Sequence, residues 1–124
     1  MTFARSSFVL AGLTLAASLV STPAPARTNF DGNWSVLIVT QSGQCDRAYR
    51  YGVAIRNGAV SYTGSLSVNL KGRVSNNGQV SVRVSAGSQG ANGTGRLARN
   101  SGSGEWRGIG SMGSCSGTWT AERR

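Results

Sequence analysis

Between Tyr49 and Val74 large apolar residues occupy every second position of the chain. Positions 49, 51, 53 and 55 are Tyr, Tyr, Val and Ile, and every even position from 60 to 74 is apolar or glycine. Side chains of a β-strand alternate between the two faces of a sheet, so this period of two predicts strands with one buried face. No segment beyond residue 26 has the 3.6-residue period of an amphipathic helix. The chain is therefore expected to be all-β.

The pair Asn57-Gly58 separates two alternating segments. Both residues tolerate a positive φ, which a two-residue hairpin turn requires. Such a turn pairs Ile55 with Val60 and Val53 with Tyr62, which puts the apolar residues of both strands on one face. The agreement between turn and pattern predicts a hairpin in this register.

A second hairpin is expected around residues 76–78. A three-residue loop with Gly78 in the left-handed conformation aligns Val74 with Val80 and Leu70 with Val84. It also places the outward-facing Lys71 and Arg83 opposite each other.

From Val60 to Val74 the apolar residues and glycines stay at even-numbered positions. This predicts one long strand, or two collinear strands, bent at Gly64 and Gly72, since glycines inside strands mark such bends.

The remaining segments predict further short strands at residues 34–40, 93–99, 104–109 and 114–122. The glycine-rich residues 87–95 are expected to contribute a loop with only a weak strand at its end. Seven or eight short antiparallel strands predict a single small barrel or a sandwich. The sequence leaves these two alternatives open.

All three tryptophans follow a glycine two positions earlier, at Gly32-x-Trp34, Gly104-x-Trp106 and Gly117-x-Trp119. Both cysteines have the same setting, at Gly43-x-Cys45 and Gly113-x-Cys115. A glycine two positions away lies on the same face of a strand, so the missing side chain leaves room for the large one. These phrases predict positions where strands bend and close.

The two cysteines are expected to form one disulfide, Cys45–Cys115. The chain has no His and no Cys-x-x-Cys spacing that would favour a metal site. The bridge would close a loop of about 70 residues, which stabilises the fold by about 4 kcal/mol in the chain-entropy model.

Residues 1–26 have the composition of a cleaved signal peptide. Arg5 precedes an apolar run from Phe8 to Val20, and Ala24 and Ala26 take the small positions of a cleavage site. An N-terminal membrane anchor is the alternative, but the run is shorter than the roughly 20 apolar residues a spanning helix needs. We expect an exported protein, periplasmic or extracellular and not membrane-spanning, with one domain over residues 27–124.

The phrase Gly32-Asn33-Trp34 resembles the opening strand of lipocalin-type barrels. A similar plan, a small exported barrel with one disulfide, occurs in bacterial envelope inhibitors of proteases and lysozyme. From Trp34 to Arg123 the layout also resembles uncharacterised small exported bacterial proteins that end in a similar Cys-Ser-Gly-Thr-Trp strand. The first resemblance implies a barrel, and the second implies no function.

Catalytic chemistry is not expected. General acid–base and nucleophilic catalysis most often use His, Asp or Glu, and the chain has no His and only four scattered acids, Asp31, Asp46, Glu105 and Glu122. The glycine-rich residues 87–95 are not followed by a helix that could bind phosphate at its N-terminus. We expect no enzyme activity, no metal and no cofactor.

The chain is strongly basic, with 13 Lys and Arg against four acids and a net charge of +9. Removal of Arg5 with the signal peptide lowers this charge to +8. A candidate basic face comprises the outward-facing Arg50, Arg56, Lys71, Arg73 and Arg83. Guanidinium groups match phosphate, sulfate and carboxylate, although a high net charge also serves solubility alone.

These observations favour a monomeric binding module for anionic envelope or surface material. Its partner would be an acidic glycan, a lipid phosphate or an acidic protein. Nucleic acid is not expected, because the protein is exported and the tyrosines point away from the basic face. Two alternatives are an inhibitor of a hydrolase such as a protease, using a terminal segment or the 87–95 loop, and a structural envelope protein.

Overall fold

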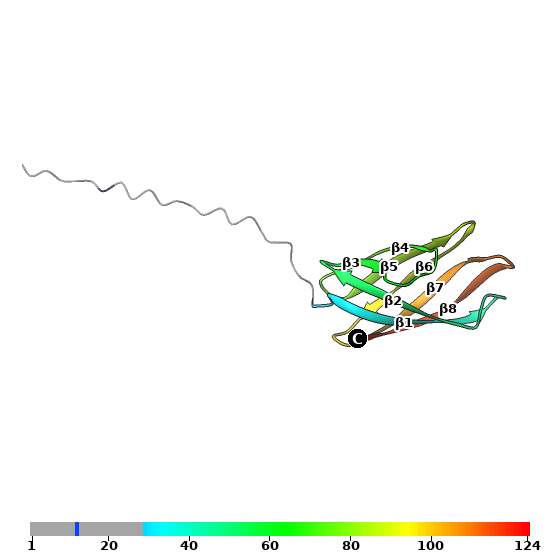
Figure 1. Ribbon diagram of the computed structural model, residues 1–124. Coiled ribbons are helices and arrows are strands. Elements are labelled where there is room, and N and C mark those ends of the chain that lie inside the picture. Colours follow the sequence, from blue (N-terminus) through cyan, green and yellow to red (C-terminus); the bar gives the residue numbers. More distant parts are fainter. Residues whose placement is uncertain (1–11, 13–28) are drawn as a thin grey trace, which may run out of the picture.

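Residues 29–124 form a closed barrel of eight antiparallel strands (Figure 1). The computed structural model describes residue 12 and residues 29–124, so the signal peptide proposed for residues 1–26 lies, apart from Gly12, outside the described residues. The strands are β1 (Gly32–Ser42), β2 (Ala48–Arg56), β3 (Ala59–Tyr62), β4 (Asn69–Val74), β5 (Gln79–Ala86), β6 (Gln89–Leu97), β7 (Ser101–Gly110) and β8 (Gly113–Arg123).

Pairing between the first and last strands decides between barrel and sandwich. Each strand pairs with the next, and β1 pairs with β8 over most of its length, from Trp34 opposite Arg123 to Ser42 opposite Ser116. A fully closed sheet has no exposed strand edge. The all-β class and the single disulfide are confirmed. Of the two architectures that the sequence leaves open, barrel and sandwich, the structure is the barrel.

Both predicted hairpins have the expected register. Ile55 lies opposite Val60 and Val53 opposite Tyr62, with Asn57 and Gly58 at φ of 52° and 79°. In the second hairpin Val74 lies opposite Val80, Leu70 opposite Val84 and Lys71 opposite Arg83, with Gly78 at φ 89°. Apolar alternation and turn chemistry were sufficient to fix these pairings.

The expectation of one continuous or collinear strand from Val60 to Val74 is wrong. The chain reverses through residues 63–68, so that β3 and β4 pair antiparallel, with Val60 opposite Gly72. The Leu66 N–H donates to the Tyr62 hydroxyl across this loop, at 3.2 Å. Opposite residues of the two strands keep the same even numbering because an odd number of residues separates them, eleven between Val60 and Gly72, so alternation alone could not reveal the reversal.

The glycine-rich stretch is also more regular than expected. Only residues 87 and 88 form a turn, and Gln89–Leu97 is a nine-residue strand, β6, paired with β5 and β7. A free loop over residues 87–95 is therefore not present. Inward-facing glycines in β6 lower its β-propensity but make space inside the barrel.

The Gly-x-Trp phrases of β7 and β8 face each other in antiparallel register. Gly104 lies opposite Trp119, and Trp106 lies opposite Gly117. A Cβ on Gly104 would come within 2.6 Å of the Trp119 indole, so this glycine makes room for the tryptophan of the neighbouring strand, whereas a Cβ on Gly117 would meet the Val39 carbonyl oxygen of β1 at 1.9 Å. The expectation that glycine accommodates a large side chain holds, but the side chain belongs to the partner strand.

One end of the barrel is filled by the hydrophobic core. Trp34 is 1% exposed and packs with Phe30, Ile55, Leu97 and other buried apolar residues. The Trp34 Nε1–H donates to the Phe30 carbonyl at 2.8 Å, which satisfies its only polar group.

Arg123 covers this core from outside. Its guanidinium lies 4.7 Å from the centre of the Trp34 ring. It also donates three hydrogen bonds to backbone carbonyls, from Nε to Arg99, from Nη1 to Asp31 and from Nη2 to Asn29, at 2.7–3.0 Å. We call this the closed end of the barrel, and the turns at residues 57–58, 75–78 and 98–100 lie at the same end.

The opposite end is formed by the loops or turns at residues 43–47, 63–68, 87–88 and 111–112. In Figure 1 the β1–β2, β5–β6 and β7–β8 connections extend away from the closed end. We call this the open end, because the interior cavity described next reaches the residues around it.

Candidate functional site: an apolar cavity in the barrel

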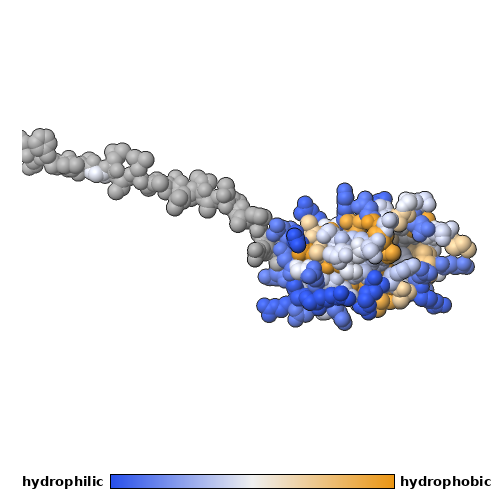
Figure 2. Space-filling view, viewed as in Figure 1, coloured by the Kyte–Doolittle hydropathy of each residue, from blue (hydrophilic) through white to orange (hydrophobic). Residues whose placement is uncertain are grey.

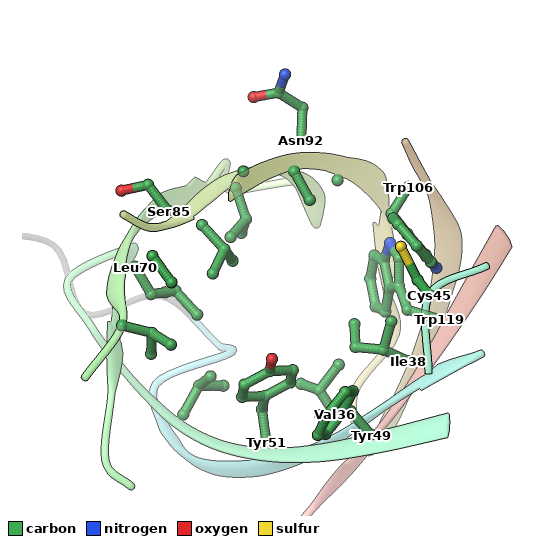
Figure 3. Close-up of a pocket in the computed structure, with 18 of the residues that line it drawn as sticks. Val36, Ile38, Cys45, Tyr49, Tyr51, Leu70, Ser85, Asn92, Trp106 and Trp119 are labelled. Atoms are coloured by element: carbon green, nitrogen blue, oxygen red, sulfur yellow. The ribbon is translucent and has the colours of Figure 1, made fainter. Parts of the chain in front are cut away.

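A cavity of about 350 Å³ occupies the barrel between the closed-end core and the open end. Figure 3 looks into it and shows side chains pointing inward from strands all around the barrel. Residues 44–46, Ser85, Gln89 and Ser111 line it at the open end, so the cavity reaches the mouth of the barrel.

Most of the cavity wall is apolar. One part is aliphatic, and the other is formed by two tryptophans beside glycines that carry no side chain. The principal wall residues are Val36, Ile38, Leu70, Val82, Val84, Ala91, Trp106 and Trp119. The same period-two pattern that predicted the core supplies this wall, because every inward position of a closed barrel faces the interior.

The two tryptophans present apolar surface to the cavity. The Trp106 Nε1–H donates to the Val39 carbonyl, and the Trp119 Nε1–H donates to the Thr94 carbonyl, both at 3.0 Å. Each indole therefore satisfies its donor on the barrel backbone. These hydrogen bonds also fix the orientation of the rings.

Two tyrosines of β2 contribute hydroxyl groups to the wall, in addition to the polar residues that line it at the open end. The Tyr49 hydroxyl donates to the Asp46 carboxylate near the mouth. The Tyr51 ring lies 5.9 Å, centroid to centroid, from the rings of both Tyr49 and Tyr62, and its hydroxyl oxygen points into the cavity (Figure 3). Within the described part of the chain this hydroxyl has no hydrogen-bond partner, which leaves it able to bond a guest.

Burial raises the pKa of the Tyr51 hydroxyl above its usual value of 10, and the nearby Tyr62 and Asp46 add to the increase. The pKa of Tyr49 is also raised, chiefly by its hydrogen bond to Asp46. Both phenols are therefore neutral at physiological pH. A neutral phenol can donate and accept a hydrogen bond, so Tyr51 suits a neutral or a negatively charged guest group.

The mouth is anchored by the disulfide Cys45–Cys115, as predicted. It joins the loop at residues 43–47 to β8. The Thr40 side chain also donates to the Asp46 carbonyl at 2.6 Å, and the Thr40 N–H donates to the Arg47 carbonyl at 2.9 Å. These bonds hold the loop that carries Asp46 against the barrel.

The residues of the predicted basic face lie in three places. Lys71 and Arg83 are directly opposite each other on β4 and β5. Arg56 and Arg73 lie nearer the closed end, on either side of Ala59 of β3. Arg50 is separate, because its Nη1 donates to the Ser35 hydroxyl of β1 at 3.0 Å.

Sequence reasoning did not identify the cavity. The sequence leaves open whether the interior is packed or hollow, because the pattern of inward apolar residues is the same in both cases. One available signal was the series of glycine and alanine at inward positions of β6 and β7, Ala91, Gly93, Gly95, Gly102, Gly104, Gly108 and Gly110. These small residues lower the side-chain volume on one wall of the barrel, and only three tryptophans are present to replace that volume.

No protein-family model, curated protein or solved structure matches the chain. Among the described residues no group of three or more His, Cys, Asp or Glu is placed to hold a metal ion. In the same part of the chain no helix has the length and apolar character to cross a membrane.

Proposed function

We propose that this protein is an exported binding module that holds one small apolar molecule in its barrel, without catalysis. The observation that carries this proposal is the cavity of about 350 Å³ with a mostly apolar wall. Ligand pockets of proteins have volumes of about 300–1,000 Å³ and combine an apolar wall with a few polar groups. This cavity is at the lower end of that range, which favours a compact guest of one or two rings or a short alkyl chain.

Tyr51 gives the guest its orientation. A guest with a hydroxyl, carbonyl or carboxylate at one end could bond the Tyr51 hydroxyl and place its apolar part against Trp106 and Trp119. Flat rings gain from the fixed indole faces, since aromatic pairs contribute about 1 kcal/mol beyond area burial. We therefore propose a guest that is mostly apolar and carries a single polar group.

Binding of the fluorescent apolar probe N-phenyl-1-naphthylamine tests this function. The matched pair is Gly93→Leu and Thr94→Leu. A Cβ on Gly93 faces the cavity at 3.7 Å from Trp119, so leucine there fills the cavity, whereas Thr94 is exposed on the opposite face of the same strand.

We expect the wild-type barrel and Thr94→Leu to enhance probe fluorescence at micromolar concentration, and Gly93→Leu to lose at least tenfold in affinity. Equal binding by both variants would show that the probe lies outside the barrel and would refute the proposal. Tyr51→Phe should leave binding of this probe nearly unchanged, because its secondary amine needs no partner there, and weaken binding of 1-naphthol.

Binding of anionic envelope material remains a second proposal. The observation that favours it is the juxtaposition of Lys71 and Arg83 across β4 and β5, where like charges in direct register are unfavourable unless an anion or solvent compensates them. Retention on an anionic matrix that falls with rising salt would support it, and retention indifferent to salt would refute it. The inhibitor alternative has less support, because the 87–95 loop is mostly a paired strand.

A further inference from the structure

The large apolar side chains that the barrel exposes gather at one end. Among the described residues these are Tyr49, Leu66, Ile109 and Met112, with exposed fractions of 44%, 56%, 62% and 72%. They lie in or beside three of the connections at the open end, at residues 43–47, 63–68 and 111–112. We call these four residues the apolar rim.

A row of polar side chains runs around the outside of the barrel just below this rim. Lys71 lies opposite Arg83, Arg83 opposite Asn92, and Asn92 opposite Arg107, so four adjacent strands contribute one residue each. All four side chains are exposed. We call Lys71, Arg83 and Arg107 the cation row.

The spacing between rim and row is set by the strands. Arg83 and Arg107 each lie three residues before the last residue of their strand, Ala86 and Gly110. At about 3.3 Å per residue the row lies roughly 10 Å from the strand ends. Ile109 shares the outward face of β7 with Arg107 and lies one step nearer the mouth.

We propose that the open end docks on the surface of an anionic lipid membrane. The apolar rim enters the boundary between headgroups and acyl chains, and the cation row contacts lipid phosphates. Apolar groups of interfacial proteins enter a bilayer by about 5–10 Å, which matches the distance between rim and row. Anionic leaflets attract cations near their surface, so the charge of the row complements this partner.

Other surfaces of the molecule fit this partner less well. In Figure 2 hydrophilic residues form most of the outline of the barrel, and apolar residues interrupt it along the upper edge and at the right-hand end. The closed end has exposed cations, including Arg56, Arg73 and Arg96, but no large apolar side chain that is exposed among the described residues there. An acidic glycan would be matched by cations alone and would give no role to the rim.

Docking in this orientation would place the mouth of the cavity against the lipid. An apolar guest could then pass between the bilayer and the barrel without crossing water. This consequence rests on the proposed function, whereas docking itself does not require a guest.

Vesicle flotation tests the proposal with residues 27–124, which include the whole barrel. Two vesicle compositions are used, pure phosphatidylcholine and an equal mixture with phosphatidylglycerol. We expect binding to the anionic vesicles at 50 mM salt and at least tenfold weaker binding to the neutral ones. Substituting Lys71, Arg83 and Arg107 together by Gln should weaken binding about a hundredfold, given roughly fivefold per cation.

Matched controls locate the surface. The triple variant Arg56→Gln, Arg73→Gln and Arg96→Gln changes the net charge equally at the closed end and should keep most of the binding. Leu66→Ser with Met112→Ser should weaken vesicle binding at least tenfold and leave binding to soluble heparin unchanged. Equal losses from both charge variants, or no loss from the rim variant, would overturn the proposal.

The probe assay without vesicles keeps the two proposals separate. Every variant named for docking leaves the cavity wall intact and should bind N-phenyl-1-naphthylamine as the wild type does. That result also shows that each variant is folded. Vesicle binding without probe binding would refute the proposed function alone, and probe binding without vesicle binding would refute docking alone.

Discussion

Two identical substitutions inside the barrel, Gly104→Ala and Gly93→Ala, are expected to have opposite effects on stability. Both glycines face inward beside Trp119, on neighbouring strands. A Cβ on Gly104 would lie 2.0 Å from the Thr94 carbonyl oxygen and 2.6 Å from the Trp119 indole. A Cβ on Gly93 would have its nearest neighbour at 3.7 Å, which is an ordinary van der Waals contact.

The magnitudes follow from these contacts. The oxygen that Gly104→Ala would strike accepts the Trp119 Nε1–H, so the substitution must move backbone and strain or break that hydrogen bond. Overpacking costs about 1–3 kcal/mol, and a strained hydrogen bond adds about 1 kcal/mol. Gly93→Ala should instead stabilise by about 0.5 kcal/mol, because alanine lowers the entropy of the unfolded chain. The predicted difference in free energy of unfolding is therefore about 3 kcal/mol.

Urea unfolding followed by tryptophan fluorescence measures both variants. The three tryptophans are retained, so the same signal serves for wild type and variants. Gly104→Ala should have a lower midpoint with an unchanged denaturant slope, and Gly93→Ala a midpoint equal to or above that of the wild type. Similar losses in both variants would refute the reasoning that glycine is required at only one of these positions.

Three other perturbations test separate parts of the fold. Arg123→Met should destabilise the barrel by about 3 kcal/mol, since it removes three hydrogen bonds from a charged donor and the contact with the Trp34 ring. A free energy of unfolding within about 0.5 kcal/mol of the wild-type value would contradict this prediction. Arg123→Lys should restore part of the loss. Replacing both Cys45 and Cys115 by Ala should cost about 4 kcal/mol, since the bridge closes a span of 70 residues; a loss below 1 kcal/mol would show that the loop is held without it. Burial raises the pKa of Tyr51 in the folded state, so the contribution of the neutral Tyr51 side chain to stability is complete below pH 10 and is lost as pH rises through the folded pKa. Phenolate absorbance should show this titration. Tyr51→Phe should reduce the loss of stability above pH 10.

The local strand pairing of the barrel could be predicted because apolar alternation and the turn residues each indicate the same register. At Asn57-Gly58 and at Gly78, the turn type and the inward faces admit one register, and the structure has it. Between Tyr62 and Asn69 the sequence offers only Gly, Ser and Thr around Leu66 and Val68. A reversal with an odd number of residues between paired positions keeps the apolar residues at even positions, so alternation could not separate a bend from a hairpin.

The candidate site depends on tertiary relations that a single sequence does not contain. The reciprocal placement of Gly104 with Trp119 and of Gly117 with Trp106 follows from the register of β7 and β8. The cavity depends on the total volume of the inward side chains of all eight strands, and the pattern of a single segment does not reveal this total. Likewise, Arg107 joins Lys71 and Arg83 only through the register of β5, β6 and β7.

The most direct test of the central claim is where a bound apolar probe contacts the protein. Intermolecular nuclear Overhauser effects between N-phenyl-1-naphthylamine and methyl-labelled protein would show this. We expect contacts to the methyl groups of Leu70, Val82 and Val84, which line the cavity from β4 and β5. Contacts restricted to Leu66 and Met112 at the rim would place the probe on the surface and would refute binding inside the barrel.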